Sequence, residues 1–124
     1  MKAHTDKTYD LQLDDLRNKL LTLGGYVETE IATSMRALTE RDSKLAETVI
    51  GQDREVNRLE IEIDEACRRL LVLRQPAASD LRFITTALKI VVDLERIGDH
   101  ATNVAEMVIF MVRGTDVRHP GSRK

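Results

Sequence analysis

Apolar side chains recur every three or four residues along most of this chain, in three long stretches separated by short polar breaks. This spacing places them on one side of an α-helix. The first stretch, about 7–40, carries Leu13, Leu16, Leu20, Leu23, Val27, Ile31, Met35 and Leu38. The second, 43–73, carries Leu45, Val49, Gln52, Val56, Leu59, Ile63, Ala66, Leu70 and Leu73. The third, 79–113, carries Phe83, Ala87, Ile90, Leu94, Ile97, Ala101, Val104, Val108 and Met111. We therefore predict three long amphipathic helices.

Turn-forming residues mark the ends of these helices. Asp42 or Ser43 is placed to cap the second helix, because short polar side chains accept hydrogen bonds from the first free N–H groups of a helix. Pro76 lacks a backbone N–H and ends the second helix, and Ser79 is then placed to cap the third. A glycine ends the third helix, and residues 114–124 are expected to form a polar tail.

Short connections between such long helices force neighbouring helices to run antiparallel. We therefore predict an all-α fold, an antiparallel up-down-up three-helix bundle. Gly24 and Gly25 in the first helix are interpreted as a point where another helix backbone packs closely. On the third helix, Ile84, Leu88 and Val91 lie beside the apolar row and widen the buried face, which favours self-association.

Composition agrees with long helices and narrows the classes of function. The 124 residues fit one domain, aromatic residues make up only 3%, and a net charge of −2 disfavours binding to nucleic acid or anionic lipid. The N-terminus does not resemble a signal peptide, and the apolar run 107–112 is too short to cross a membrane. We therefore expect a cytoplasmic protein with no direct membrane insertion.

The sequence contains no arrangement of residues typical of an enzyme. Ser/His/Asp patterns, a P-loop and a dinucleotide-binding motif are all missing, and no histidine follows a glutamate at the spacing of di-iron bundles. His100 is expected to face solvent or an interface. Cys67 cannot form an internal disulfide and is expected to pack at the edge of the core rather than bind metal.

Oxygen-bearing side chains form a row beside the apolar row on the second and third helices. Its members are Asp53, Asn57, Glu60, Asp64, Glu95, Asp99, Asn103 and Glu106. Carboxylates one turn apart repel each other, and a hard cation such as Mg²⁺, Ca²⁺, Mn²⁺ or iron would relieve that repulsion. The alternative is a solvated acidic face, since acidic pairs at this spacing arise by chance in a chain with 21 acids. Gly98, between Glu95 and Asp99, leaves room for an ion, a water or a neighbouring helix.

Two longer segments carry a resemblance to a known family. They are "IDEACRRLLVLRQPAASDLR" at 63–82 and "LERIGDHATNVAE" at 94–106, and the likeness continues upstream in "LGGYVE", "DSKLAETVI" and "VNRLEIEIDEA". Together they closely resemble the PhoU family of phosphate-signalling regulators over nearly the whole chain.

The resemblance implies a cytoplasmic bundle of antiparallel helices that is not an enzyme. Its partners would be the ATPase subunit of a phosphate ABC transporter and a phosphate-sensing histidine kinase, both of which it restrains when phosphate is plentiful. The family's acidic motifs bind metal clusters in some members. They map here onto Glu60, Asp64, Glu95 and Asp99, with Asp53, Asn57 and Asn103 alongside. The resemblance implies divalent or iron-type ions, among Mg, Mn, Fe, Zn and Ca.

The chain departs from typical members of this family in length. They carry two tandem three-helix repeats, whereas this sequence shows one, and its ending "FMVRGTDVRHPG" at 110–121 is similar to the close of the family's second repeat. We interpret it as a natural one-repeat member that pairs into a six-helix homodimer or a higher oligomer. A one-repeat member can serve a different transporter or kinase. The alternative function is that of a metal-sensing helical bundle without a role in phosphate regulation.

Overall fold

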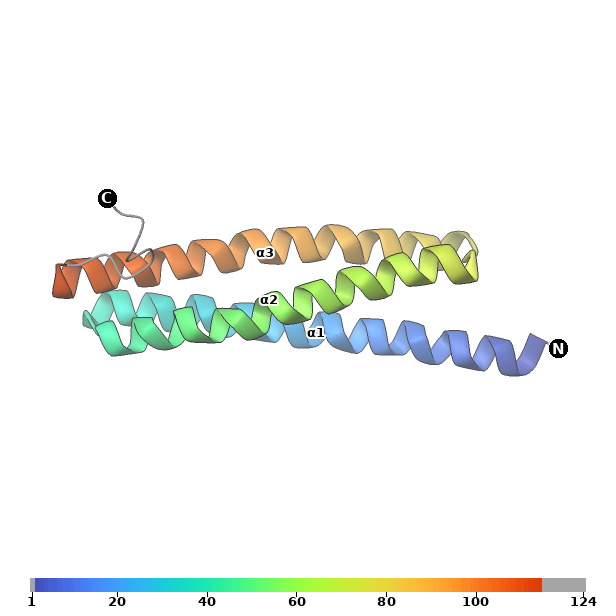
Figure 1. Ribbon diagram of the computed structural model, residues 1–124, viewed down its shortest axis with the longest axis horizontal. Helices are drawn as coiled ribbons and strands as arrows, with labels where there is room; N and C mark the ends of the chain where they lie inside the picture. The colour runs from blue at the N-terminus through green and yellow to red at the C-terminus, as the bar shows by residue number, and fades with distance from the viewer. Residues whose placement is uncertain (1, 115–124) are drawn as a thin grey trace.

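Three long helices make up the structure. The computed structural model describes residues 2–114, with side chains from residue 7 onward. Helices α1 (Lys2–Glu40), α2 (Ser43–Arg74) and α3 (Ala78–Arg113) lie side by side, and each reverses the direction of the one before (Figure 1). Every pair of helices is in contact, and no strand occurs within residues 2–114. The predicted all-α antiparallel three-helix bundle is confirmed, while residues 115–124 of the predicted tail lie outside the described part.

The connection between α1 and α2 is closed by a side-chain cap. Asp42 accepts a hydrogen bond from the backbone N–H of Leu45 at 3.0 Å, as predicted, and α2 begins at Ser43. This bond satisfies one of the N–H groups that a helix start leaves without a partner. α1 itself begins at Lys2, earlier than predicted at about residue 7, because its backbone hydrogen bonding extends beyond the apolar row on which the prediction depended.

The connection between α2 and α3 is formed by the segment around Pro76. Gln75 ends α2 in a left-handed conformation with φ of 48°, immediately before the proline. The prediction that Ser79 caps α3 is wrong, because α3 begins at Ala78 and its capping residue, Ala77, contributes no side-chain bond. The helix starts as soon as the proline permits, which places Ser79 inside the first turn. Gly114 ends α3 with φ of 73°, as predicted.

The interior of the bundle follows a regular alternation of three- and four-residue steps on all three helices. On α1 the inward positions are Leu13, Leu16, Leu20, Leu23, Val27, Glu30, Ser34 and Ala37. On α2 they are Ala46, Val49, Asp53, Val56, Glu60, Ile63, Cys67 and Leu70. On α3 they are Ile84, Ala87, Val91, Leu94, Gly98, Ala101, Ala105 and Val108. This is the heptad repeat of a left-handed helical bundle.

The predicted apolar row on α1 is wrong in its second half. It steps by four residues from Leu23 through Val27 and Ile31 to Met35, and each such step exceeds a full helical turn by about 40°. The row therefore drifts away from the partner helices. Ile31 is 40% exposed and Met35 is 52% exposed.

The rows predicted on α2 and α3 are wrong at several positions, although other members such as Leu59 are buried. Gln52 and Leu73 on α2 are exposed, as are Ile90, Ile97 and Met111 on α3. The prediction followed the larger apolar side chains, whereas the bundle buries smaller neighbours. Close approach of the helix backbones favours residues with short side chains at these positions.

Small and medium residues therefore supply part of the α3 core. Gly98 and Ala105 are buried, and so are Ile84 and Val91, which the sequence placed beside the main row. The buried face of α3 is as wide as predicted, although its centre lies on a different row.

The prediction of close backbone packing at Gly24 and Gly25 is wrong. A Cβ atom built on either residue would meet no other atom within 4 Å, and α1 runs through both positions without a break. Gly25 is exposed and Gly24 is half-buried, and no neighbouring helix comes close to either.

The two other single-residue predictions agree with the structure. Cys67 is completely buried in the core, and burial raises the pKa of its thiol to about 11, so the thiol stays protonated. His100 is exposed on α3. None of the described helices is long and apolar enough to cross a membrane.

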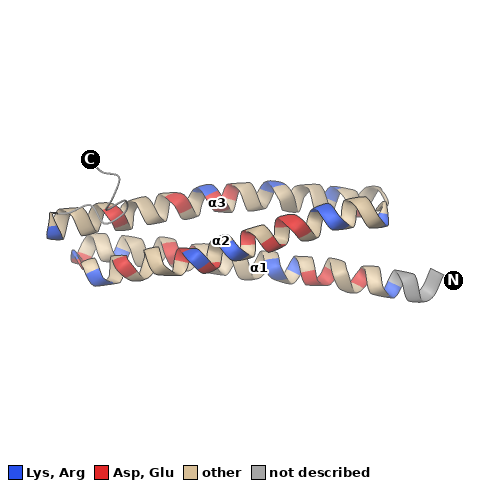
Figure 2. Ribbon diagram, viewed as in Figure 1, with Lys and Arg blue, Asp and Glu red and all other residues tan. Residues whose placement is uncertain are grey.

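A polar layer divides the hydrophobic core into two clusters. The longer cluster extends over Leu13 to Val27 and the residues opposite them, and the shorter one surrounds Ala37. Between them the inward positions are Glu30 and Ser34 on α1, Asp53 on α2 and Gly98 on α3. Acidic residues lie on all three helices in this middle part of the bundle (Figure 2).

Candidate functional site

The innermost acidic residue of the polar layer is Glu30 of α1. Its side chain is only 1% exposed, and neither carboxyl oxygen accepts a hydrogen bond from any described donor group. Its neighbour is Asp53 of α2, a second acid, and two carboxyl groups hydrogen-bond to each other only when one keeps its proton. Burial, followed by the adjacent Asp53 and the charges of Glu60 and Asp99, raises the pKa of Glu30 to about 8.

Gly98 of α3 provides the space that the Glu30 side chain occupies. A Cβ atom at this position would lie 3.0 Å from Glu30 Oε1 and 3.9 Å from Asp53 Oδ1. The sequence predicted that this glycine leaves room for an ion, a water or a helix. The structure fills the room with a carboxyl group from the neighbouring α1, so that all three helices meet at one point.

Glu60 of α2 is the second buried acid of this region. It is 8% exposed, and burial, together with the charges of Glu95, Asp53 and Asp99, raises its pKa to about 7. We call the five acids that influence one another here the acidic cluster. It consists of Glu30, Asp53, Glu60, Glu95 and Asp99.

Four of the seven predicted site residues thus belong to one cluster: Asp53, Glu60, Glu95 and Asp99. The other three lie beside it. Asp64 is held in an ion pair by Arg68 on the same helix, with 2.8 Å between Oδ2 and Nε. Asn57 donates a hydrogen bond to Asp53 Oδ2 at 3.3 Å, and Asn103 is exposed on α3.

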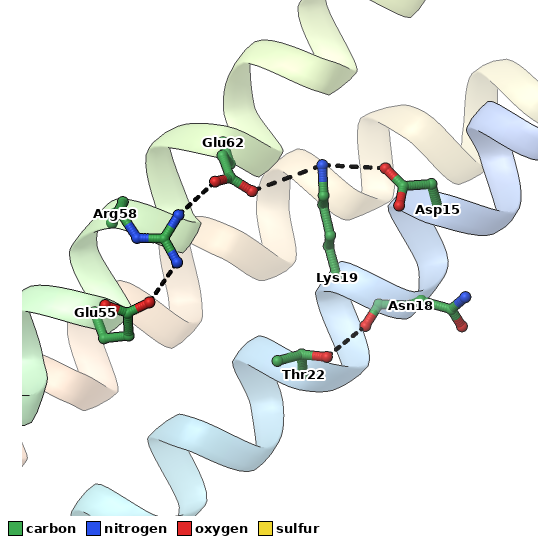
Figure 3. A network of polar contacts seen from close by, with 7 residues as sticks. All are labelled: Asp15, Asn18, Lys19, Thr22, Glu55, Arg58 and Glu62. Atoms are coloured by element: carbon green, nitrogen blue, oxygen red, sulfur yellow. Dashed lines mark hydrogen bonds and ion pairs between the residues drawn. The ribbon is translucent and has the colours of Figure 1, made fainter.

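Acids on the outer flank of α1 and α2 differ from the acidic cluster because they have basic partners. Arg58 bridges Glu55 and Glu62, and Lys19 contacts Glu62 at 3.6 Å and Asp15 at 3.0 Å (Figure 3). Such exposed pairs contribute little to stability. By contrast, no described Lys or Arg forms an ion pair with any of the five acids of the cluster.

An open groove between α1 and α2 leads to Glu30. It has a volume of about 360 Å³ and is lined by Tyr26, Thr29, Glu30, Gln52, Glu55 and Val56. Glu30 lines this groove, while its two carboxyl oxygens are buried behind it. The groove's polar lining residues offer further oxygen atoms along the path.

The acidic cluster fits a hard cation by three observations. Its donors are oxygen atoms only, its innermost carboxyl oxygens are buried without a donor, and the glycine opposite them leaves space that a Cβ would fill. Among the residues that the structure describes, no three His, Cys, Asp or Glu side chains converge as they would around a bound metal ion. Glu95 and Asp99 are exposed on α3. The metal site therefore stays a prediction.

Glu30 is the residue that sequence reasoning missed. The prediction assigned the buried row to Ile31 because it is apolar, and gave Glu30 no role. One signal was available. Alternating steps of three and four from Leu16 through Leu23 and Val27 arrive at Glu30, so a strictly kept heptad repeat places an acid in the core.

These features define a class: a slender antiparallel three-helix protein with an acidic layer in its interior. The chain belongs to the PhoU family, because the PhoU domain matches residues 20–108. The predicted family resemblance is therefore confirmed.

Curated relatives and a solved structure agree with this assignment. The chain is 44% identical over 127 residues to a phosphate-specific transport system accessory protein PhoU homolog of Pseudomonas aeruginosa, covering 97% of this chain and 52% of the relative. It is 38% identical over 109 residues to the Escherichia coli accessory protein PhoU, covering 88% of this chain and 45% of the relative.

A crystal structure of PhoU from Pseudomonas aeruginosa superimposes with a TM-score of 0.82 at 45% identity, covering 86% of this chain and 51% of the other. The chain thus spans about half the length of the relatives it matches.

Proposed function

We propose that this protein acts as a regulator of phosphate uptake and of phosphate-starvation signalling. The observation that carries the proposal is the family membership: the PhoU domain covers most of the chain, and relatives at 38% and 44% identity are accessory proteins of phosphate-specific transport systems. The proposed mode of action is that of a non-enzymatic adaptor in the cytoplasm. It restrains the ATPase subunit of a phosphate ABC transporter and a phosphate-sensing histidine kinase.

The bundle has exposed apolar side chains of the kind that adaptors use for protein contacts. Leu73 is 69% exposed and Val72 is 74% exposed at the end of α2, while Ile31 and Met35 lie outward on α1. Large apolar side chains that gather on a surface favour association with other proteins. We propose that such surfaces serve the partners and a second copy of the chain, which together with the first would equal one relative in length.

We further propose that the acidic face takes up metal ions, with Mg, Mn, Fe, Zn and Ca as the candidates. The residues that would hold them are Asp53, Asn57, Glu60, Asp64, Glu95, Asp99 and Asn103. A bound cation would neutralise carboxylates that otherwise repel one another. The raised pKa of Glu60, which faces Glu95 and Asp99 across the interface of α2 and α3, supports the proposal.

The adaptor role is tested by direct binding. The purified chain is immobilised and presented, at high phosphate and with Mn²⁺ or Mg²⁺ supplied, with the transporter ATPase subunit and with the cytoplasmic part of the kinase. We expect saturable binding to at least one of them. Failure to bind either partner would contradict the proposal. The exposed variant Glu65→Gln, which alters charge away from the core, is the matched control and should bind as the unmodified chain does.

A metal-sensing bundle without a phosphate role is the second candidate, favoured by the acidic interior. Elemental analysis of the purified protein and of the Glu95→Ala/Asp99→Ala variant separates the two. Metal that is retained by the unmodified chain and lost in the variant establishes the site. If that metal-containing protein binds neither partner, the second candidate is favoured. If partner binding is present and depends on the site, the adaptor function is favoured.

A further inference from the structure

The acidic cluster has an inner member that comes from α1, outside the acidic motifs of α2 and α3. We infer that Glu30 is a cation ligand, so that a divalent ion bound in the acidic cluster would be held by carboxylates from all three helices. This inference rests on the proposed uptake of metal ions and adds to it a ligand, a position inside the bundle and a route of entry.

Geometry places Glu30 at the meeting point of the three helices. Glu30 Oε1 and Asp53 Oδ1 lie 3.0 Å and 3.9 Å from one point in space, the position of the Cβ that Gly98 lacks. Two carboxyl oxygens from different helices therefore already approach one location. Glycine at position 98 keeps that location open, since any other residue would fill it.

Burial makes a solvated role for Glu30 untenable. The side chain is 99% shielded from water, and its two oxygens have no described hydrogen-bond donor. A buried polar group without a partner costs roughly 1 to 3 kcal/mol, and more when it is charged. A leucine at this inward position would avoid that cost, so the carboxyl group favours a counter-charge that arrives from solution.

The charges that face Glu30 all have the same sign. They are Asp53 and Glu60 from α2 and Asp99 from α3, while the amide of Asn57 donates to Asp53. No described Lys or Arg forms an ion pair with Glu30. A set of carboxylate oxygens with no basic partner and no sulfur or imidazole ligand suits a hard divalent cation such as Mn²⁺ or Mg²⁺.

The groove between α1 and α2 is the nearest opening to Glu30 that the structure describes, and a side-chain rotation of Glu30 would expose its carboxyl group there. Glu30 is one of its lining residues, together with Thr29, Gln52 and Glu55, whose oxygen atoms can accompany an ion inward. Glu95 and Asp99 lie on the exposed side of α3 and can close the ligand set by rotation of their side chains. Such a site would couple the ion to the relative positions of α1, α2 and α3.

Mn²⁺ binding to the purified full chain tests the inference. Free Mn²⁺ is counted by electron paramagnetic resonance during a titration, and melting temperatures are recorded by circular dichroism with and without Mn²⁺. We expect Glu30→Gln, which keeps the shape and removes the charge, to lower the Mn²⁺ affinity at least tenfold. It should also lose most of the Mn²⁺-induced rise in melting temperature. The exposed control Glu65→Gln should retain both.

The comparison with and without Mn²⁺ separates a ligand from a merely structural residue, because a structural change shifts both melts equally. Should Glu30→Gln fail to fold, Glu30→Met, which is apolar and similar in volume, replaces it. The inference is overturned if the Mn²⁺ affinity of Glu30→Gln is within twofold of that of the unmodified chain while Glu95→Ala/Asp99→Ala binds Mn²⁺ more weakly. In that case the proposed metal face stands without Glu30. If the unmodified chain binds none of Mn²⁺, Mg²⁺, Fe²⁺, Zn²⁺ and Ca²⁺, both metal proposals fail. The adaptor function is then judged separately by partner binding.

Discussion

The buried carboxyl group of Glu30 is expected to make this protein less stable as pH rises. Its pKa of about 8 lies far above the ordinary value of 4.5, because burial and the adjacent Asp53 penalise the charged form. Between these two pH values the folded chain keeps a proton that the unfolded chain releases. The contribution of the protonated Glu30 to the free energy of unfolding is therefore fully present below about pH 4.5. It is lost progressively as pH rises toward 8.

The magnitude follows from the difference between the two pKa values. A shift of one unit corresponds to about 1.4 kcal/mol, so the difference between about 8 and 4.5 corresponds to a loss of at most about 5 kcal/mol. This is a large fraction of the roughly 5 to 15 kcal/mol by which domains are stable. Glutamine at position 30 has nearly the same shape and no ionisable group, so Glu30→Gln should remove this part of the pH dependence.

Urea unfolding followed by helical circular dichroism measures the effect, with a chelator present to exclude metal ions. Near pH 5 the two proteins should be about equally stable. Near pH 8.5 Glu30→Gln should be more stable than the unmodified chain by several kcal/mol, up to about 5. The unfolding free energy of Glu30→Gln should still fall somewhat as pH rises, because Glu60 still titrates with a pKa of about 7.

The exposed variant Glu65→Gln serves as the control and should follow the unmodified chain at both pH values. The destabilising role of Glu30 is refuted if the unfolding free energy of Glu30→Gln falls with pH as steeply as that of the unmodified chain. It is also refuted if the variant is the less stable protein near pH 8.5. Either result would mean that Glu30 carries its charge in the fold without penalty.

Three further changes test the packing and the helix ends. Gly98→Ala should lower stability by about 1 kcal/mol in the unmodified chain, because the new Cβ lies 3.0 Å from Glu30 Oε1, but raise it by about 1 kcal/mol in Glu30→Ala. Equal effects in thermal melts of both backgrounds would show that residues 30 and 98 do not touch. Asp42→Ala should cost about 1 kcal/mol in urea unfolding, because it removes the 3.0 Å bond to the Leu45 N–H, and no loss would mean that solvent caps α2 equally well. Gly25→Ala should raise stability by about 1 kcal/mol, since no atom lies within 4 Å of the added Cβ, and a lower melting temperature would point to a contact there after all.

The ends of the helices were largely predictable because their causes are local. Asp42 caps α2 through a bond to a residue three positions away, and Pro76 ends a helix through its own ring. Ser79 was the exception. Whether a serine caps depends on where the backbone first becomes helical, and α3 begins one residue before it.

The residues that face the core were less predictable because two neighbouring rows on each helix carry apolar side chains. On α3 the sequence favoured Ile90 and Ile97, and the structure buries Val91 and Gly98 instead. Hydrophobicity alone does not choose between such rows. The choice depends on how closely the backbones of the other two helices can approach, and small residues permit the closest approach.

Local sequence is sufficient to predict the helical periodicity, the three long segments, the Asp42 cap of α2, the end of α2 at Pro76 and the family to which the chain belongs. Each of these depends on residues near one another in the chain or on motifs that can be read directly. Only the tertiary structure decided the rotation of each helix about its axis and the register between them. That rotation turns Glu30 of α1 inward to meet Asp53 and Gly98, and it turns Ile31 outward. The penalty for burying a carboxyl group, and the space that accepts it, exist only where three separate segments of the chain come together.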